Sequence, residues 1–296
     1  MSRLIDEIIE FLKKKGIACS RQRRADSEVV SAFAICSGDE RIIMPLEISA
    51  TSMVEASEEG DALQECINII RRHDKIYPLI ITEDRWKSQQ GMMQARLLAH
   101  LEIFEQAYAR NCEVRRIEKS EAEAFLKENH SYGYAACKYR YGLFLKRHTG
   151  HIAAELSAKG SADCRKGKLI AVATFSNARK WIKNGIEIKS YEWTRYASLP
   201  EIRVSGGMGK LLKSFIKEVQ PDDIMSYADL EWSEGSVYSQ LGFTLEGEKA
   251  PVMFEMDGLW QRRPYGKQSE SAERETIAYF RNFGSNKYRL KITQYE

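Results

Sequence analysis

A glycine-rich turn followed by a helix is the part of this chain best suited to binding an anion. The stretch Arg203-Val-Ser-Gly-Gly-Met-Gly-Lys210 carries three glycines, and an apolar helix is expected from about Gly209 to Val219. Glycine has no Cβ, so the backbone N–H groups of such a turn can face an anion directly. The helix adds the positive end of its dipole. This pattern predicts a pyrophosphate site; the alternative is a plain tight turn before a helix.

The strand expected before this turn, residues 186–197, carries a candidate functional carboxylate, Glu192. A glutamate on a central strand is costly unless it is paired or used. Period-two alternation places Glu192 on the same face as Thr194 and Tyr196, and Arg195 on the opposite face. Glu192 is therefore expected to be a base or a substrate ligand, or else a salt-bridged strand residue whose partner is not Arg195.

Two further carboxylates, Asp229 and Glu231, follow the next expected strand at its carboxyl end. Binding sites in open α/β sheets gather at such ends, so both are candidates for binding a cationic substrate or for assisting as a base. Earlier in the chain, His130 and Tyr132 form a polar-aromatic stretch after an expected helix. The competing interpretation of His130 is a local hydrogen bond.

The elements that position these residues predict an α/β (α+β) fold in two domains, because 296 residues is long for one domain. Residues 1–110 are expected to form an α/β N-terminal domain that ends in a long helix over 89–109. Residues 111–296 are expected to form a mixed central sheet flanked by helices. Residues 261–286 are polar and charged and are expected to form an extended excursion.

The order of elements after residue 112, with the motifs at 188–243, resembles the GNAT N-acetyltransferase superfamily. The glycine turn of that superfamily usually reads Gln/Arg-x-x-Gly-x-Gly/Ala. Arg203 and Gly206 match it in one register, and Gly207 with Gly209 match it in the next, where Val204 replaces Gln/Arg. The resemblance implies acetyl-CoA or another acyl-CoA as co-substrate. The residues that would hold its pyrophosphate are Arg203, Val204, Gly206, Gly207, Gly209 and Lys210.

The resemblance also implies chemical roles. Tyr238 stands four residues before Gly242-Phe243 and matches the tyrosine that protonates the departing thiolate. A tyrosine pKa of about 10 is near that of an alkyl thiol, which suits this role. Glu192 would assist the attacking amine, and His130 and Tyr132 lie where the superfamily places a substrate-binding loop. The implied reaction is acyl transfer to a small-molecule or macromolecular amine.

Two alternatives stay open for the C-terminal domain. The runs His130-Ser-Tyr-Gly, Ala173-Thr-Phe-Ser176 and Ser226-Tyr-Ala-Asp229 more faintly resemble phage Mom-like proteins of the same fold, which alter adenine bases. That resemblance implies nucleic acid as partner, with aromatic side chains stacking on an extruded base. The other alternative is a non-catalytic domain that has lost its cofactor.

The N-terminal domain has an order of elements that resembles the restriction-endonuclease-like core. That core holds a divalent metal with an acidic residue and a Glu-x-Lys motif on the next strand. Here Glu47-Ile48-Ser49 has serine in place of the lysine, and Asp26 is a poor candidate for the upstream acid. An inactive or structural domain is therefore expected.

Composition limits the kinds of partner, metal site and cellular location that we expect. The net charge of +3 is too small to indicate nucleic acid by itself. None of the six cysteines forms a C-x-x-C pair, so we expect reduced thiols and no metal site. No apolar run approaches the roughly 20 residues that span a bilayer, and the first residues do not form a signal-peptide pattern. We therefore expect a cytoplasmic protein without a membrane partner.

Overall fold

The computed structural model describes residues 3–22, 33–36, 41–74, 78–146, 167–183, 185–266 and 275–293. Two compact units alternate along the sequence. The first comprises Met1–Met93, Ala228–Glu234 and Glu248–Asn286, and the second comprises Gln94–Tyr227, Gly235–Gly247 and Lys287–Glu296. Residues 94–110 therefore pack with the second unit. Whether residues 1–110 act as a separate domain stays a prediction.

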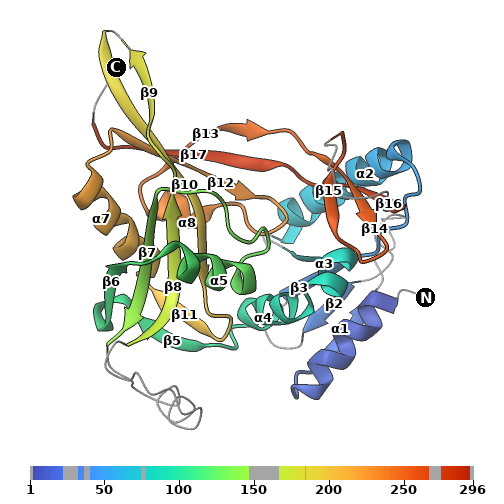
Figure 1. Ribbon diagram of the computed structural model, residues 1–296. Coiled ribbons are helices and arrows are strands. Elements are labelled where there is room, and N and C mark those ends of the chain that lie inside the picture. Colours follow the sequence, from blue (N-terminus) through green and yellow to red (C-terminus); the bar gives the residue numbers. More distant parts are fainter. Residues whose placement is uncertain are drawn as a thin grey trace. The chain divides into compact units, whose positions relative to one another are not determined.

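A large mixed sheet forms the frame for most of the candidate residues (Figure 1). In the described residues its order is β13-β17-β12-β10-β8-β7-β6, with β9 paired to β10. The strands are β6 (Cys112–Arg116), β7 (Tyr139–Leu145), β8 (Lys168–Phe175), β9 (Arg179–Lys183), β10 (Ile186–Ser198), β12 (Asp223–Asp229), β13 (Thr244–Lys249) and β17 (Ser285–Lys291). β10 runs parallel to β12 and antiparallel to β8, and β8 runs antiparallel to β7.

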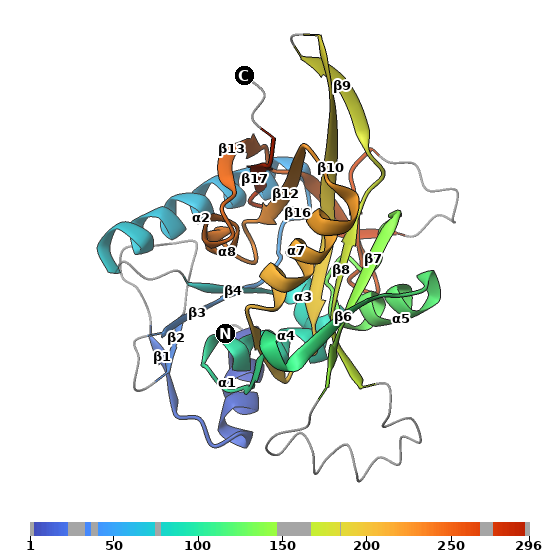
Figure 2. The ribbon, with the colours of Figure 1, turned by 90° about the vertical axis from the view of Figure 1, so that its left-hand side faces the viewer.

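Helices cover both faces of this sheet, α5 (Lys119–Asn129) on one and α7 (Gly207–Val219) on the other, as the two views show (Figures 1 and 2). On the α7 face, Phe215 stacks on Phe175 at 3.9 Å between ring centroids. On the α5 face, Phe125 and Leu126 belong to a cluster with Val172. Alternate residues of the same strands thus serve two separate cores.

An ionic cluster fastens the last strand, β17, to its neighbours. Arg289 Nη1 lies 2.5 Å from Oδ1 of the fully buried Asp223, which also accepts a hydrogen bond from Ser190 Oγ. Arg289 Nε donates to Glu246 Oε1 at 2.6 Å. Burial opposes the charge of Arg289, but these two carboxylates raise the pKa of its guanidinium overall. The cluster joins β10, β12, β13 and β17.

The first unit combines N-terminal elements with strands from the end of the chain. Its four-stranded sheet has the order β1-β2-β3-β4 and its three-stranded sheet the order β15-β14-β16. One hydrophobic cluster includes Ile67 of α2, Ile80 of β4, Met256 of β14 and Phe280 of β16. The elements are α1 (Arg3–Lys14), β1 (Cys19–Gln22), β2 (Phe33–Cys36), β3 (Arg41–Leu46), α2 (Met53–Asp74), β4 (Leu79–Thr82), α3 (Glu83–Ser88), β14 (Met253–Asp257), β15 (Arg262–Pro264) and β16 (Thr276–Arg281).

Two sequence expectations about the elements were wrong. The helix expected over 89–109 is α4 (Gln90–His100), and it is followed by the strand β5 (Glu105–Tyr108). Glu102 has a positive φ of 61°, which ends helical geometry, and β5 then pairs parallel with β11 (Ile202–Ser205). The expected polar excursion at 261–286 instead contains β15 and β16, whose buried Phe280 could be recognised only with its long-range partners.

Glu47 of the Glu47-Ile48-Ser49 run makes a contact within the N-terminal elements. Glu47 Oε1 accepts the backbone N–H of Leu4 at 3.1 Å, a contact at the start of α1. No group of three or more potential metal ligands is found in the described part of the chain. Asp26 lies outside the described residues. No helix among the described residues has the length and apolar character needed to span a membrane.

The Glu246–Arg289 pair predicts how acid affects stability. Hydrogen bonding to Arg289 lowers the pKa of Glu246 from 4.5 to about 2. A lowered pKa gives stability that is complete above the unfolded value and is lost as pH falls through the folded value. We therefore expect the native chain to lose more stability between pH 4.5 and 2 than Glu246→Gln does, measured by urea unfolding. Glu248→Gln, on the same strand, is the control; equal pH dependence in the native chain and Glu246→Gln would contradict this.

Candidate functional site

The glycine turn begins α7 as the sequence predicts. β11 leads into Gly206, which is the N-cap of α7 with a left-handed backbone at φ 74°. Glycine adopts this conformation without the steric cost that other residues meet. The N-cap makes no side-chain hydrogen bond to the helix. Glycine has no side chain that could supply such a bond, so the first backbone N–H groups of α7 receive no side-chain acceptor from residue 206.

The neighbouring glycines have packing roles. A Cβ on Gly207 would lie 3.0 Å from Val204 Cβ, and one on Gly209 would lie 3.3 Å from Leu241 Cδ2. Arg203 is exposed, with its guanidinium carbon 5.2 Å from the centre of the Phe104 ring. These contacts explain why small residues stand at 207 and 209 whether or not a ligand is bound.

A groove of about 450 Å³ runs along α7 from the turn. Its lining residues are Gly206, Gly209, Lys210, Lys213, Ser214 and Lys217. Lys210 Nζ donates to the backbone oxygens of Ala109 and Cys112 at 2.8 and 2.6 Å, so it fastens α7 to the start of β6 and the residues just before it. Lys213 and Lys217 are exposed along the same groove. Their spacing of four residues on the helix was a signal that the sequence interpretation missed.

The sheet opens where β10 and β12 separate. Their parallel ladder pairs Ser190, Tyr191 and Glu192 with Asp223, Ile224 and Met225 and ends there. Beyond this point β10 contains a β-bulge, because its register against β8 shifts between Trp193 and Arg195. The carbonyl of Trp193 accepts a hydrogen bond from the Ser226 hydroxyl at 3.0 Å. A side-chain hydroxyl therefore bonds to the Trp193 carbonyl at the position where the ladder between the two strands has ended.

Tyr238 on α8 (Ser236–Gln240) reaches this opening. Its hydroxyl lies 2.9 Å from Ser226 Oγ, and its ring stacks on Tyr288 at 5.3 Å. Trp193 meets the same ring edge-on at 6.3 Å. Burial raises the pKa of Tyr238, although the Ser226 hydrogen bond opposes this, so the phenol is protonated at neutral pH. Ser226 has one proton; when it donates to Trp193, Tyr238 can donate to Ser226.

The bulge corrects the predicted faces of β10. With Thr194 as the extra residue, Arg195 pairs with Thr174 and Tyr196 with Ala173. Arg195 therefore shares the α5 face with Glu192, and Tyr196 turns to the face of Trp193, whose ring it meets at 6.2 Å. The prediction that Arg195 points away from Glu192 was wrong. Burial lowers the pKa of Arg195, while the charges of Glu192 and Tyr132 oppose this.

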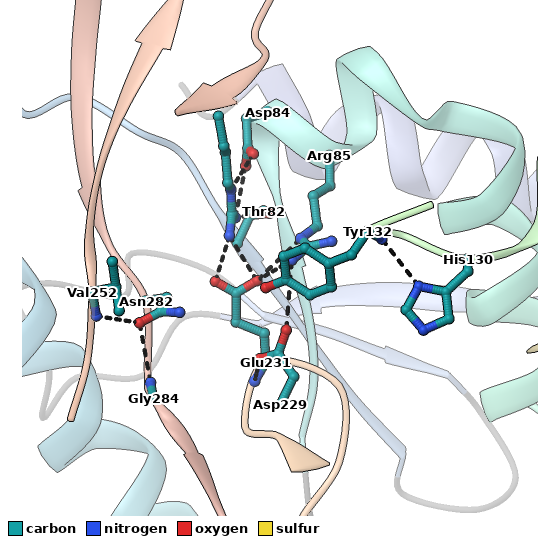
Figure 3. Close-up of polar contacts among 11 residues, drawn as sticks. Thr82, Asp84, Arg85, His130, Tyr132, Asp229, Glu231, Val252, Asn282 and Gly284 are labelled. Atoms are coloured by element: carbon teal, nitrogen blue, oxygen red, sulfur yellow. Dashed lines mark hydrogen bonds and ion pairs between the residues drawn. The ribbon is translucent and has the colours of Figure 1, made fainter. Parts of the chain in front are cut away.

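His130 and Tyr132 lie in the segment after α5. The backbone N–H of Tyr132 donates to His130 Nδ1 at 3.1 Å (Figure 3). Nδ1 is therefore an acceptor, and a neutral His130 carries its proton on Nε2. The adjacent Gly133 oxygen accepts a hydrogen bond from Arg195 Nε at 3.1 Å. This contact brings the segment after α5 to β10 near Glu192, and a substrate-binding role for His130 and Tyr132 stays a prediction.

Asp229 and Glu231 belong to the first unit and form part of a buried ionic network (Figure 3). Arg262 Nη1 contacts both Glu231 oxygens at 2.7 and 2.9 Å, and its Nε lies 2.5 Å from Asp84. Arg85 Nε donates to Glu231 at 3.0 Å, and Arg85 Nη2 lies 3.7 Å from Asp229. Glu231 is only 2% exposed. This arrangement supports a structural role, and a substrate role for these two carboxylates stays a prediction.

The network keeps its charges because they are matched. Burial would raise the pKa of Asp84, but the Arg262 guanidinium outweighs it and lowers that pKa. Burial likewise disfavours charge on Arg262, and Glu231 with Asp84 reverses this and raises its pKa. Removing one partner would leave an uncompensated buried charge. The sequence interpretation missed the network because its members come from three distant segments.

Comparisons with known proteins were made for the whole chain. No protein-family model matches it, and no curated protein matches its sequence. Similar solved structures include the NatC complex bound to Gag peptide and CoA (12% identity, 62% of this chain and 99% of that chain, TM-score 0.36). Others are a spermidine N-acetyltransferase SpeG variant from Vibrio cholerae (12%, 62% and 94%, 0.37) and NAA60 from Arabidopsis thaliana with acetyl-CoA (10%, 61% and 99%, 0.37).

The described strands and helices of the chain themselves define its fold class. That topology is a mixed α/β fold with a large central sheet and additional N-terminal elements, as the sequence predicts. The elements β6, α5, β7, β8, β10, glycine turn, α7, β12, α8 and β13 follow one another in the order that the sequence predicts, with β9 and β11 as additional strands. The fainter resemblance to Mom-like proteins received no support from the comparisons.

The buried network generates a stability prediction. Arg262→Leu should lower the free energy of unfolding by about 3–5 kcal/mol, because Asp84 and Glu231 would lose their main counterion. The measurement is urea unfolding of the full chain. Arg3→Gln is the control: the Arg3 side chain is 89% exposed, and its replacement should change stability by less than about 0.5 kcal/mol. Equal free energies of unfolding for the two variants would contradict the predicted stabilisation by the Arg262 network.

Proposed function

We propose that this protein is an acyl-CoA-dependent N-acyltransferase that moves an acyl group, first of all acetyl, to an amine. The observation that carries the proposal is the opening between β10 and β12, with the Tyr238 hydroxyl held at its edge by Ser226. The parallel ladder ends inside the sheet, although both β10 and β12 continue beyond its last pair. An opening of this kind can admit a thioester between two strands.

The proposed donor site follows from the elements around this opening. The pantetheine arm of CoA is extended and carries amides, so it can pair with the strand edges that β10 and β12 leave open. The pyrophosphate would lie at the first turn of α7, next to Arg203, Val204, Gly206, Gly207 and Gly209. Lys210 would hold the helix in place, and the exposed Lys213 and Lys217 would offer positive charge to the phosphates.

The proposed reaction is direct transfer. The neutral amine attacks the thioester carbonyl, the C–S bond breaks, and the acyl group forms an amide with the amine. Tyr238 gives its proton to the departing thiolate, since its raised pKa keeps it protonated. Glu192, on the α5 face beside the opening, takes the proton that the amine loses. His130 and Tyr132 would line the acceptor side through the Gly133–Arg195 contact.

The cytoplasmic location expected from the sequence is part of this proposal. A non-catalytic domain would have a filled or blocked turn, whereas the groove beside Gly206 supports a ligand-binding one. No observation in the described residues favours nucleic acid over this function.

The cofactor is tested by ligand stabilisation. Acetyl-CoA at 100 times its Kd should add about 2.7 kcal/mol to the native state and raise Tm by several degrees. CoA itself should give a similar Tm shift, because it shares the pyrophosphate contacts of acetyl-CoA. Calorimetry or dye-monitored melting is sufficient. An unchanged Tm with both ligands would refute the proposed donor site.

The acid is tested by Tyr238→Phe, which keeps the aromatic stacking on Tyr288 and removes the hydroxyl. We expect kcat for thiol release to fall by roughly 10²–10⁴-fold, with the acetyl-CoA Tm shift retained. Tyr265→Phe, at a half-exposed tyrosine of the first unit, is the matched control and should keep full turnover. Undiminished turnover in Tyr238→Phe would remove Tyr238 from the mechanism.

A further inference from the structure

Two arginines flank one threonine on the α5 face of the large sheet. Thr174 of β8 is the cross-strand partner of both Arg140 on β7 and Arg195 on β10. Directly opposed residues of neighbouring antiparallel strands point to the same face. Thr174 is completely buried, and its hydroxyl lies 2.7 Å from that of Thr194. The two arginine side chains therefore lie on one face of the sheet, on the two strands that flank β8.

Both arginines are held by neutral groups. Arg195 donates from Nε to the Gly133 oxygen and from Nη1 to the Thr194 oxygen, at 3.1 and 2.7 Å. Arg140 Nη1 donates to the Cys137 oxygen at 3.0 Å, and its buried Nε has no hydrogen-bond partner. Within the described residues, no carboxylate forms an ion pair with either one. Two cations on one face of the sheet that are partly buried without an ion pair are costly, and a bound anion would offset that cost.

Glu192 stands on the same face because of the bulge at Thr194. Only its backbone makes hydrogen bonds among the described residues, to Ser176, and its carboxylate forms no ion pair there. It is near enough to influence the charge of Arg195. A carboxylate and a guanidinium thus lie beside each other while each keeps hydrogen-bonding capacity for a ligand.

We propose that the acceptor is an amine that also carries a carboxylate, that is, an amino acid or a similar zwitterion. The ligand's carboxylate would bind Arg195 and Arg140, for which paired N–H donors are the favoured geometry. Its amino group would lie at Glu192, beside the opening between β10 and β12. This inference rests on the proposed function, since it names the substrate class of the same site.

The first test compares matched ligands on the unaltered full chain. Thiol release from acetyl-CoA is measured with a set of amino acids and with the corresponding carboxamides, which keep the amine and side chain but lack the anion. At least one amino acid should exceed its carboxamide in kcat/KM by roughly 10–100-fold, the size expected for charged hydrogen bonds. Carboxamides or simple amines that match or exceed every amino acid would overturn the proposal, as would a phosphate-bearing amine preferred over all of them.

The second test uses variants. Arg195→Gln should raise KM for the best amino acid at least tenfold and reduce its advantage over the carboxamide, with the acetyl-CoA Tm shift unchanged. Arg179→Gln on the exposed start of β9 is the control and should retain both. Equal losses on amino acid and carboxamide would show a merely structural role and overturn the proposal.

Failure of the proposed function gives a different result. Absent Tm shifts with CoA ligands, or no thiol release with any amine, would refute acyl transfer. Calorimetric binding of the amino acids and their carboxamides then decides the anion site by itself. Preference for the amino acids, lost in Arg195→Gln, would support the site, and no preference would refute it.

Discussion

The end of the parallel ladder between β10 and β12 is the constraint on which the rest of the site depends. After Glu192 and Met225 the two strands no longer pair, and the bulge at Thr194 changes the direction of every later side chain of β10. Trp193 turns its carbonyl to Ser226, and Ser226 in turn holds Tyr238. The end of the ladder thus leaves the opening, the Trp193 carbonyl and Ser226 position the phenol, and the extra residue brings Arg195 to the face of Glu192.

The glycine turn shows what sequence spacing can and cannot predict. The turn and α7 can be predicted from neighbouring residues alone, because consecutive residues encode both a left-handed Gly206 and an apolar helical face. The pattern cannot separate an anion-binding glycine from a packing one. Gly207 and Gly209 are small because Val204 and Leu241 lie against them, and Leu241 follows Gly209 by a whole strand and helix.

Other differences between sequence and structure have a similar physical origin. Strict alternation assigned Arg195 to the wrong face because a bulge leaves no clear mark in a run such as Trp193-Thr-Arg195. The ion pairs of Glu231 were not predicted because its partners, Arg85 and Arg262, are distant in sequence. Fold class and element order depend on local periodicity and were predictable. Register, bulges and the partners of buried charges depend on long-range contacts and were not.

In the proposed reaction, the donor and the acceptor would bind on opposite faces of the large sheet. The α7 face carries aromatic packing, the uncapped helix start and exposed lysines, which suit a phosphate-bearing donor. The α5 face carries Glu192, Arg195 and Arg140, which suit a zwitterion. A closed sheet would keep donor and acceptor apart. Because β10 and β12 separate beside Trp193, the proposed donor and acceptor would meet at that point and not along the paired part of these strands.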